Sequence, residues 1–307
     1  MVVNTSLISN LIFPVVMLVG LFLAFSGKLT IGTVSTAASM ANFVISPCHQ
    51  IAQCWAKVKS SKGIRQRLEA AMAAPKEAET GEAIGKIERV ICRNAGFAYP
   101  GAAAPVLRDA TLEVSGTQKV ALVGESGCGK STFLKLLMRF WERSGGEIDY
   151  DDIDIDKINT DSLLKNVTMV SQTTYLFEET IEDNLRIAKP DATPEEIENA
   201  CKMAAVHDFI MTLPDGYKTQ VTALGDNLSA GEKQRIGLAR AFLRGSELIL
   251  LDEPTSNVDS INEGIILKAL KEQKNKKSII LVSHRESTMA IADRIYKVKE
   301  GRMTEAV

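Results

Sequence analysis

The sequence predicts an α/β domain that follows a hairpin of two apolar helices. One observation is a sharp change in charge: Lys28 is the only Lys, Arg, Asp or Glu among the first 56 residues, whereas charges of both signs are dense beyond them. The other is an alternation of strand-like and helix-like segments that begins at about Gly85. We therefore expect a partial transmembrane domain over 1–74, a linker over 75–84 and an α/β domain over 85–307.

Two apolar stretches precede the α/β region. The first, Leu7–Phe25, is about as long as a bilayer span. The second, Ile31–Trp55, carries no formal charge and is rich in Ala, Ser and Thr. Alone it is a marginal span, but small residues let transmembrane helices approach closely. We expect the two stretches to form a transmembrane helical hairpin that turns at Gly27 and Lys28.

The charges after the second stretch indicate how the hairpin is oriented. Five basic residues precede any acidic one, namely Lys57, Lys59, Lys62, Arg65 and Arg67. Because basic residues flank the cytoplasmic ends of membrane helices, this end should be cytoplasmic and the hairpin turn outside. The second helix should continue into the cytoplasm to about Ala74 and end near Pro75.

Short apolar runs mark the strands of the α/β region. Several are almost continuously apolar, as expected for parallel strands that are buried on both faces. The candidates are residues 87–92, 119–124, 167–171, 247–252, 278–283 and 294–299.

The segment GESGCGKST, residues 124–132, follows one of these strands and fits the pattern G-x-x-x-x-G-K-[ST]. Its glycines leave room for backbone N–H groups to wrap phosphate oxygens, and the next helix presents its positive end. Lys130 should reach the β- and γ-phosphates of a nucleotide, and Ser131 should bind Mg²⁺. A chance glycine-rich turn is the alternative. The expected nucleotide contacts are Gly124, Glu125, Ser126, Gly127, Cys128, Gly129, Lys130, Ser131 and Thr132.

A second constellation is ELILLDEPTSNVD, residues 247–259, in which an apolar strand ends in two adjacent carboxylates. Asp252 is well placed to hold Mg²⁺ through water, and Glu253 to polarise an attacking water. An ordinary solvated strand end is the alternative, but it is a poor explanation beside a phosphate-binding loop.

Further motifs occur around these two segments in a definite order. They are FAYP with Tyr99, VSQ with Gln172, LSAGEKQR at 228–235, SNVD at 256–259 and LVSHR with His284. Together with GESGCGKST and LILLDEP, they resemble the nucleotide-binding domain of ATP-binding-cassette (ABC) transporters. The resemblance covers the chain from about residue 5 to its end. It implies a P-loop NTPase fold with a helical subdomain, and ATP and Mg²⁺ as cofactors.

The resemblance also implies roles for residues around the phosphate loop. Tyr99 should stack on adenine, with an aromatic cap on the core as the alternative. Gln172 should bind Mg²⁺ and couple the site to the membrane domain. His284 should contact the γ-phosphate and orient water, with Glu253 as the catalytic base.

In this family the LSAGE stretch closes over the ATP held by the phosphate loop of a partner chain. Ser229 and Gly231 should therefore face the partner's γ-phosphate, and Asp259 should lie at the same interface. The implied partner is a second half-transporter, identical or different, with ATP sandwiched between the two chains.

Membrane helices placed before the ATPase domain resemble exporter-type half-transporters, which carry six helices there. Only two are present, so we expect the C-terminal part of a half-transporter, completed by the remaining transmembrane helices. The resemblance implies ATP hydrolysis coupled to export, in the plasma membrane with the ATPase domain in the cytoplasm.

Two alternative functions fit parts of this sequence. One is a regulatory or vestigial membrane-attached ATP-binding fragment without transport activity. The other is an ABC ATPase that acts on nucleic acid or ribosomes. The apolar stretch Leu7–Phe25 and a net charge of -2, without a basic excess, argue against nucleic acid as a partner.

Overall fold

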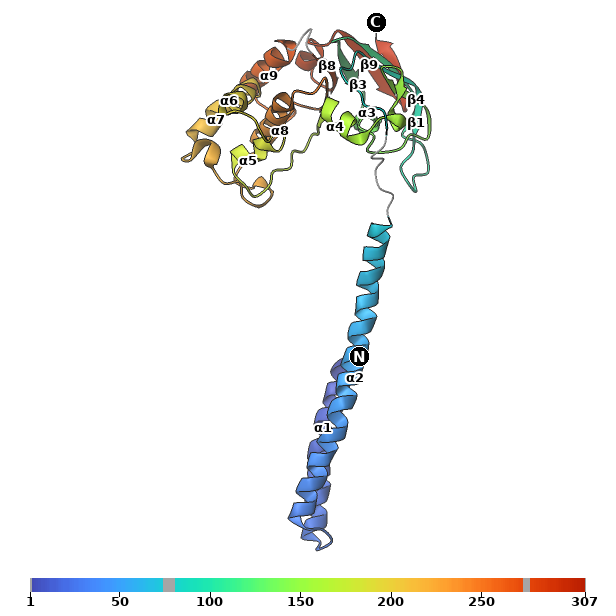
Figure 1. The fold of residues 1–307 in the computed structure, drawn as a ribbon, viewed down its shortest axis with the longest axis vertical. Helices are drawn as coiled ribbons and strands as arrows, with labels where there is room; N and C mark the ends of the chain where they lie inside the picture. The colour runs from blue at the N-terminus through green and yellow to red at the C-terminus, as the bar shows by residue number, and fades with distance from the viewer. Residues whose placement is uncertain (1, 74–80, 273–276, 307) are drawn as a thin grey trace. The chain divides into compact units, whose positions relative to one another are not determined.

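The chain divides into two units in the computed structural model, Met1–Lys76 and Glu77–Val307. The structure describes residues 2–73, 81–272 and 277–306, without the side chains of residues 2–13, Leu224 and some residues between 38 and 52. The first unit is a helical hairpin, and the second holds a sheet with its helices (Figure 1).

The hairpin consists of α1 (Val2–Phe25) and α2 (Ile31–Met72), which pack against each other. Gly27 adopts a positive φ of 75° in the turn, a conformation that glycine reaches without strain. Thr30 then caps α2, since its side chain accepts a hydrogen bond from the backbone N–H of Thr33 at 3.4 Å. The turn thus falls where the sequence predicts it. Helix α2 ends at Met72, with Ala73 as its C-cap, close to the end predicted near Pro75; Pro75 itself lies outside the described residues.

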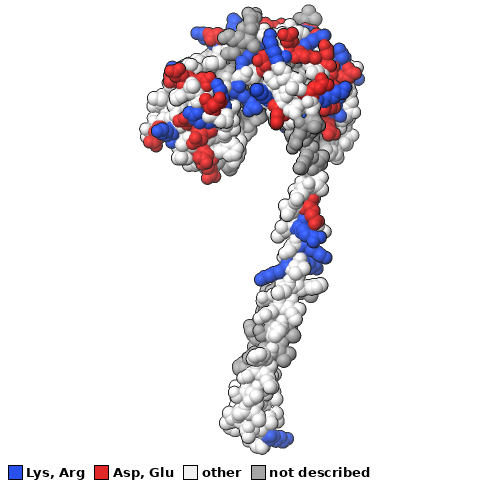
Figure 2. Space-filling model, viewed as in Figure 1, with Lys and Arg blue, Asp and Glu red and all other residues white. Residues whose placement is uncertain are grey.

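The described part of the chain contains no helix that is both long enough and apolar enough to cross a membrane. The structure therefore does not show the transmembrane assignment that the sequence suggests for this hairpin. Large apolar side chains are nevertheless exposed on it, among them Leu18, Phe22 and Phe25. Figure 2 shows Lys, Arg, Asp and Glu concentrated on the second unit and on part of α2.

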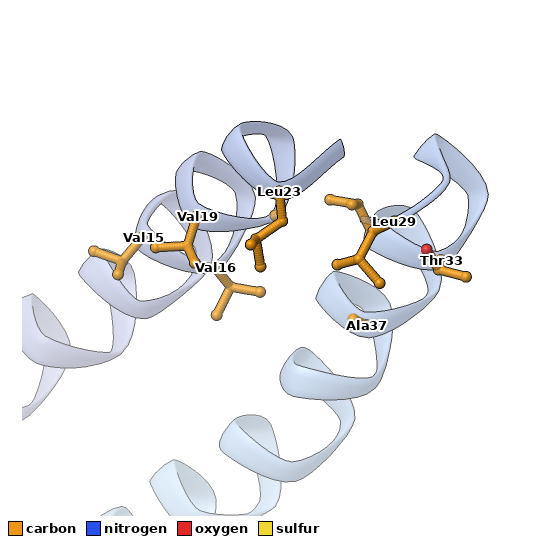
Figure 3. A pocket seen from close by; sticks show the side chains of 9 residues that line it. Val15, Val16, Val19, Leu23, Leu29, Thr33 and Ala37 are labelled. Atoms are coloured by element: carbon orange, nitrogen blue, oxygen red, sulfur yellow. The ribbon is translucent and has the colours of Figure 1, made fainter. Parts of the chain in front are cut away.

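An apolar groove of 520 Å³ lies between the two helices of the hairpin. Figure 3 shows Leu23 and Leu29 pointing into the space between the helices, with Val16 beside them. At Gly20, α1 packs closely on α2, because a Cβ at this position would come within 2.5 Å of the Val34 side chain. The hairpin is therefore packed closely at this glycine and open beside it.

The second unit is built on a ten-stranded sheet with the order β5-β4-β1-β2-β10-β9-β3-β8-β7-β6. Strands β3, β6, β7 and β8 run parallel, and β9 pairs in parallel with β3. Strands β1, β2, β4 and β5 form an antiparallel part. The bounds are β1 (Arg89–Phe97), β2 (Leu107–Ser115), β3 (Lys119–Val123), β4 (Gly145–Tyr150), β5 (Ile153–Asp154), β6 (Val167–Val170), β7 (Leu248–Asp252), β8 (Ser278–Val282), β9 (Arg294–Lys299) and β10 (Arg302–Ala306).

Helices cover this sheet and extend beyond it. The α-helices of the second unit are α3 (Lys130–Leu137), α4 (Thr160–Asn166), α5 (Ile181–Arg186), α6 (Pro194–Met203), α7 (His207–Thr212), α8 (Ala230–Arg244), α9 (Ser260–Glu272) and α10 (Glu286–Met289). Short 3-10 turns occur at Ile155–Lys157, Gly216–Lys218 and Ala223–Gly225. Figure 1 shows α5, α6 and α7 grouped at one side, away from β1 and β4.

Two hydrophobic clusters hold these parts together. One lies between the antiparallel strands and α3, and includes Phe97, Phe133 and Tyr150. The other lies between the helical side and the parallel strands, and includes Ile210, Ile236 and Leu281. The second unit is thus an α/β sheet with helices, the fold class that the sequence predicts for this part of the chain.

Candidate functional site

The predicted phosphate-binding loop, residues 124–132, follows β3 and includes the first residues of α3. Gly129 precedes α3 with a φ of 105°, and a Cβ there would come within 2.8 Å of the Leu107 side chain. A Cβ at Gly124 would approach the Val298 carbonyl oxygen to 2.2 Å. Both positions therefore require glycine for space as well as for conformation.

Lys130 lies inside this loop and is only 5% exposed. Its Nζ donates hydrogen bonds to the carbonyl oxygens of Gly124 at 2.8 Å and Glu125 at 2.7 Å. The ammonium group is thus held within the loop by backbone oxygens. A positive charge enclosed by a glycine-rich loop at a helix N-terminus is suited to a polyphosphate.

Ser131 and Asp252 meet across the site. The Ser131 hydroxyl donates to Asp252 Oδ1 at 3.0 Å, and Asp252 is 7% exposed at the end of β7. Burial raises the pKa of Asp252, an effect that the Ser131 hydrogen bond opposes and the charge of Glu253 strengthens. A hydroxyl and a carboxylate are oxygen donors of the kind Mg²⁺ prefers, so the residues present fit this ion.

Two predicted residues, Gln172 and His284, lie against the carboxylate of Glu253. Gln172 Nε2 donates to Glu253 Oε2 at 3.1 Å, and His284 Nε2 lies 3.4 Å from Glu253 Oε1. They meet because each closely follows one of three neighbouring parallel strands, β6, β7 and β8, which end at the same edge of the sheet.

A pocket of 540 Å³ opens beside the phosphate-binding loop. Residues from the loop, from the end of β8 and from β9 line it, including Glu125, Cys128, His284 and Lys297. The loop and His284 thus border one open space.

Tyr99 follows β1 and is half-buried next to the loop. Its hydroxyl is 3.0 Å from the Thr132 hydroxyl, and its ring packs edge-on against Phe97 at 4.8 Å and Trp141 at 5.3 Å between centroids. This half-buried position is compatible with both predicted roles of Tyr99, stacking on adenine and capping the core.

The LSAGE stretch forms the start of α8. Ser229 accepts a hydrogen bond from the Glu232 backbone N–H at 3.3 Å, and Glu232 accepts one from the Ser229 N–H at 2.7 Å. This is a capping box, which explains why the turn continues at once into a helix. Gly231 packs against the segment after β7, since a Cβ there would lie 2.5 Å from the Asn257 carbonyl oxygen.

Asp259 is exposed and caps the start of α9. Its carboxylate accepts hydrogen bonds from the N–H groups of Ile261 and Asn262 at 3.1 Å and from the Asn262 side chain at 2.6 Å. The Asn262 side chain, followed by these backbone groups, lowers the pKa of Asp259. Ser229 and Asp259 thus contact the first turns of α8 and α9, and Gly231 packs on Asn257. Gln172 and His284 instead lie against Glu253.

Residues 107–256 match the family model described as ABC transporter. This domain belongs to the ABC transporter family. A probable ABC transporter ATP-binding/permease protein from Haemophilus influenzae is 50% identical over 229 residues, which make up 75% of this chain and 41% of that protein. A fatty acid ABC transporter ATP-binding/permease protein from Mycobacterium bovis is 35% identical over 307 residues, 98% of this chain and 48% of that protein.

A solved structure of a bacterial Atm1-family ABC exporter with ATP bound is similar to the whole chain. The TM-score is 0.77 and the identity 30%, over 99% of this chain and 54% of the exporter chain. The present chain therefore spans about half, or less, of the length of these ABC transporter relatives.

The sequence analysis does not identify several polar residues around the predicted ATP site. Arg285, directly after His284, forms an ion pair with Glu263 of α9, and Glu263 also accepts a hydrogen bond from the Ser287 hydroxyl at 2.6 Å. Gln234 of α8 is 1% exposed and donates to the backbone carbonyl oxygen of Glu253. The sequence does not indicate these contacts, nor that Glu263 and Gln234 are buried.

Proposed function

We propose that the chain is the ATP-hydrolysing subunit of an ABC-type exporter. Contacts within two small clusters of side chains at one edge of the sheet support this most directly. Ser131 bonds to Asp252, and Gln172 and His284 lie against Glu253.

In this proposal each residue has a separate task. Lys130 and the backbone N–H groups of the loop bind the β- and γ-phosphates of ATP, and Ser131, Asp252 and Gln172 hold Mg²⁺, which neutralises charge on the phosphates. Tyr99 stacks on adenine. His284 binds the γ-phosphate and orients the attacking water, and Glu253 takes the proton of that water as the P–O bond to ADP breaks.

A complete site requires a second chain. Ser229, Gly231 and Asp259 are proposed to face the ATP that a partner's phosphate-binding loop holds, so that hydrolysis follows dimerisation. The homologues named ATP-binding/permease proteins support a membrane location for the hairpin. The apolar run Leu7–Phe25 and the exposed Phe22 and Phe25 support the same proposal.

The test is phosphate release by the purified full chain with Mg²⁺ and ATP. Glu253→Gln should lower kcat by at least about 100-fold, the scale of a lost general base, while ATP binding persists. Glu286→Gln is a matched control, because Glu286 is exposed just after the His284 segment.

Normal turnover by Glu253→Gln would show that Glu253 is not the base. A wild-type chain that binds ATP but releases no phosphate would instead favour the regulatory ATP-binding fragment.

A further inference from the structure

Gln234 is a buried amide in α8 that uses both of its polar atoms. Its Nε2 donates to the Glu253 carbonyl oxygen at 2.6 Å and to the Ser256 hydroxyl at 3.3 Å. Its Oε1 accepts a hydrogen bond from the Asn257 N–H at 3.2 Å. A buried amide satisfied at both ends has a defined orientation, so these contacts fix the backbone that follows β7.

The backbone held in this way is unusual at Glu253. Glu253 has a φ of 52°, in the left-handed region that residues other than glycine rarely adopt. Its N–H donates to the Val282 carbonyl oxygen at 3.0 Å, and its carbonyl oxygen accepts from Gln234. Such a conformation persists only where its surroundings enforce it, and Gln234 supplies one of these restraints.

The same helix touches this backbone at a second point. Gly231, one turn before Gln234, packs so closely on Asn257 that a Cβ would lie 2.5 Å from its carbonyl oxygen. Residues three apart in a helix share a face, so Gly231 and Gln234 present a single surface to residues 253–257. A shift of the LSAGE turn cannot leave that segment unchanged.

We propose that Gln234 is a positioning residue that ties the LSAGE turn to the backbone of Glu253. When the turn closes on ATP held by a partner chain, Gln234 then fixes the position of the Glu253 carboxylate, which acts on the ATP bound to its own chain. This inference rests on the proposed function, because it needs two ATP sites that share one chain. It adds to that function a physical link from one site to the other.

Two substitutions separate the contacts of Gln234. Gln234→Glu keeps an acceptor for the Asn257 N–H but loses the donor and sets a negative charge against the Glu253 carbonyl oxygen. Gln234→Met keeps the length of the side chain and loses all three hydrogen bonds. Gln118→Glu is the matched control, because among the described residues the Gln118 side chain only accepts, through Oε1, from the Ser115 N–H at 3.1 Å.

Steady-state ATPase kinetics of the full-length variants test the proposal, with thermal unfolding to verify folding. Gln234→Glu should lower kcat about tenfold, with KM for ATP changed less than about twofold and the Hill coefficient reduced towards 1. Gln234→Met should show the same pattern more weakly, and Gln118→Glu should match the wild type.

Unchanged kcat and Hill coefficient in folded Gln234 variants, with an active wild-type chain, would overturn this inference alone. A change in KM or unfolding temperature without a change in kcat would also overturn it, since that is the result of a merely structural role. An inactive wild-type chain would contradict the proposed function as well.

Discussion

At the scale of single residues, the cysteines show how burial separates similar groups. Cys54 is exposed and Cys128 is half-exposed in the phosphate-binding loop, whereas Cys92 and Cys201 are buried. Burial raises the pKa of Cys92 to about 12 and that of Cys201 to about 11. The reactive thiolate is therefore scarce at Cys92 and Cys201 at pH 8, besides being inaccessible.

Alkylation of the folded chain at pH 8 should follow this order. Cys54 should react first and Cys128 more slowly, while Cys92 and Cys201 should react only after denaturation. Mg-ATP should slow the reaction of Cys128 but not that of Cys54, because the proposed ATP site includes Cys128. Mass spectrometry of peptides after timed quenching measures each rate. Equal protection of Cys54 and Cys128 by ATP would contradict the assignment of Cys128 to the ATP site.

At the scale of elements, the segment between β6 and α5 depends on one buried side chain of α5. Asn184 donates to the carbonyl oxygens of Phe177 at 3.0 Å and Thr180 at 2.9 Å, and accepts from the Phe177 N–H at 2.9 Å. Arg240 of α8 also donates to the Asn184 side chain at 2.7 Å, and burial lowers the pKa of Arg240 to about 10. The segment after Gln172 is thus attached to α8.

Asn184→Ala should reduce the free energy of unfolding by about 3 kcal/mol, because it leaves buried backbone groups without partners. Asn199→Ala is the control, since Asn199 is exposed on α6, and it should change stability by less than about 0.5 kcal/mol. Chemical denaturation of both variants, followed by circular dichroism, gives the comparison. Equal losses would show that the Asn184 contacts contribute little.

The predictability of these elements follows from burial. Strands β3, β7 and β8 are almost entirely buried, so they read as continuous apolar runs and were predicted. The structure adds β2, β4, β5 and β10, and makes β1 an antiparallel strand. Strand β2 alternates buried and exposed residues, and β4 begins with two glycines, so neither contains an apolar run.

The site also contains features that the sequence predicts and contacts that only the fold shows. Gln172, Glu253 and His284 stand in recognisable motifs, and the parallel strands before them bring them together. Gln234 stands in LSAGEKQR and Arg285 in LVSHR, but their contacts join segments far apart in sequence. A buried polar side chain and an exposed one have the same letter in the sequence, so these contacts required the fold.

At the scale of the whole molecule, the hairpin determines on which side of a membrane the ATPase domain would act. The basic stretch of α2 predicts a cytoplasmic end there, and the turn at Lys28 should then be outside. Lys28 lies in the turn and Ser61 in the basic stretch of α2, and both are exposed. Replaced by cysteine in a chain whose native cysteines are alanine, they report on the two sides.

Intact cells that express these variants should fix the orientation. A membrane-impermeant maleimide should label Lys28→Cys before permeabilisation and Ser61→Cys only afterwards, because a bilayer separates the two positions if the hairpin spans it. Labelling of both after permeabilisation is the control for reactivity. Labelling of Ser61→Cys in intact cells would reverse the proposed orientation, and recovery of the chain outside the membrane fraction would refute the transmembrane hairpin.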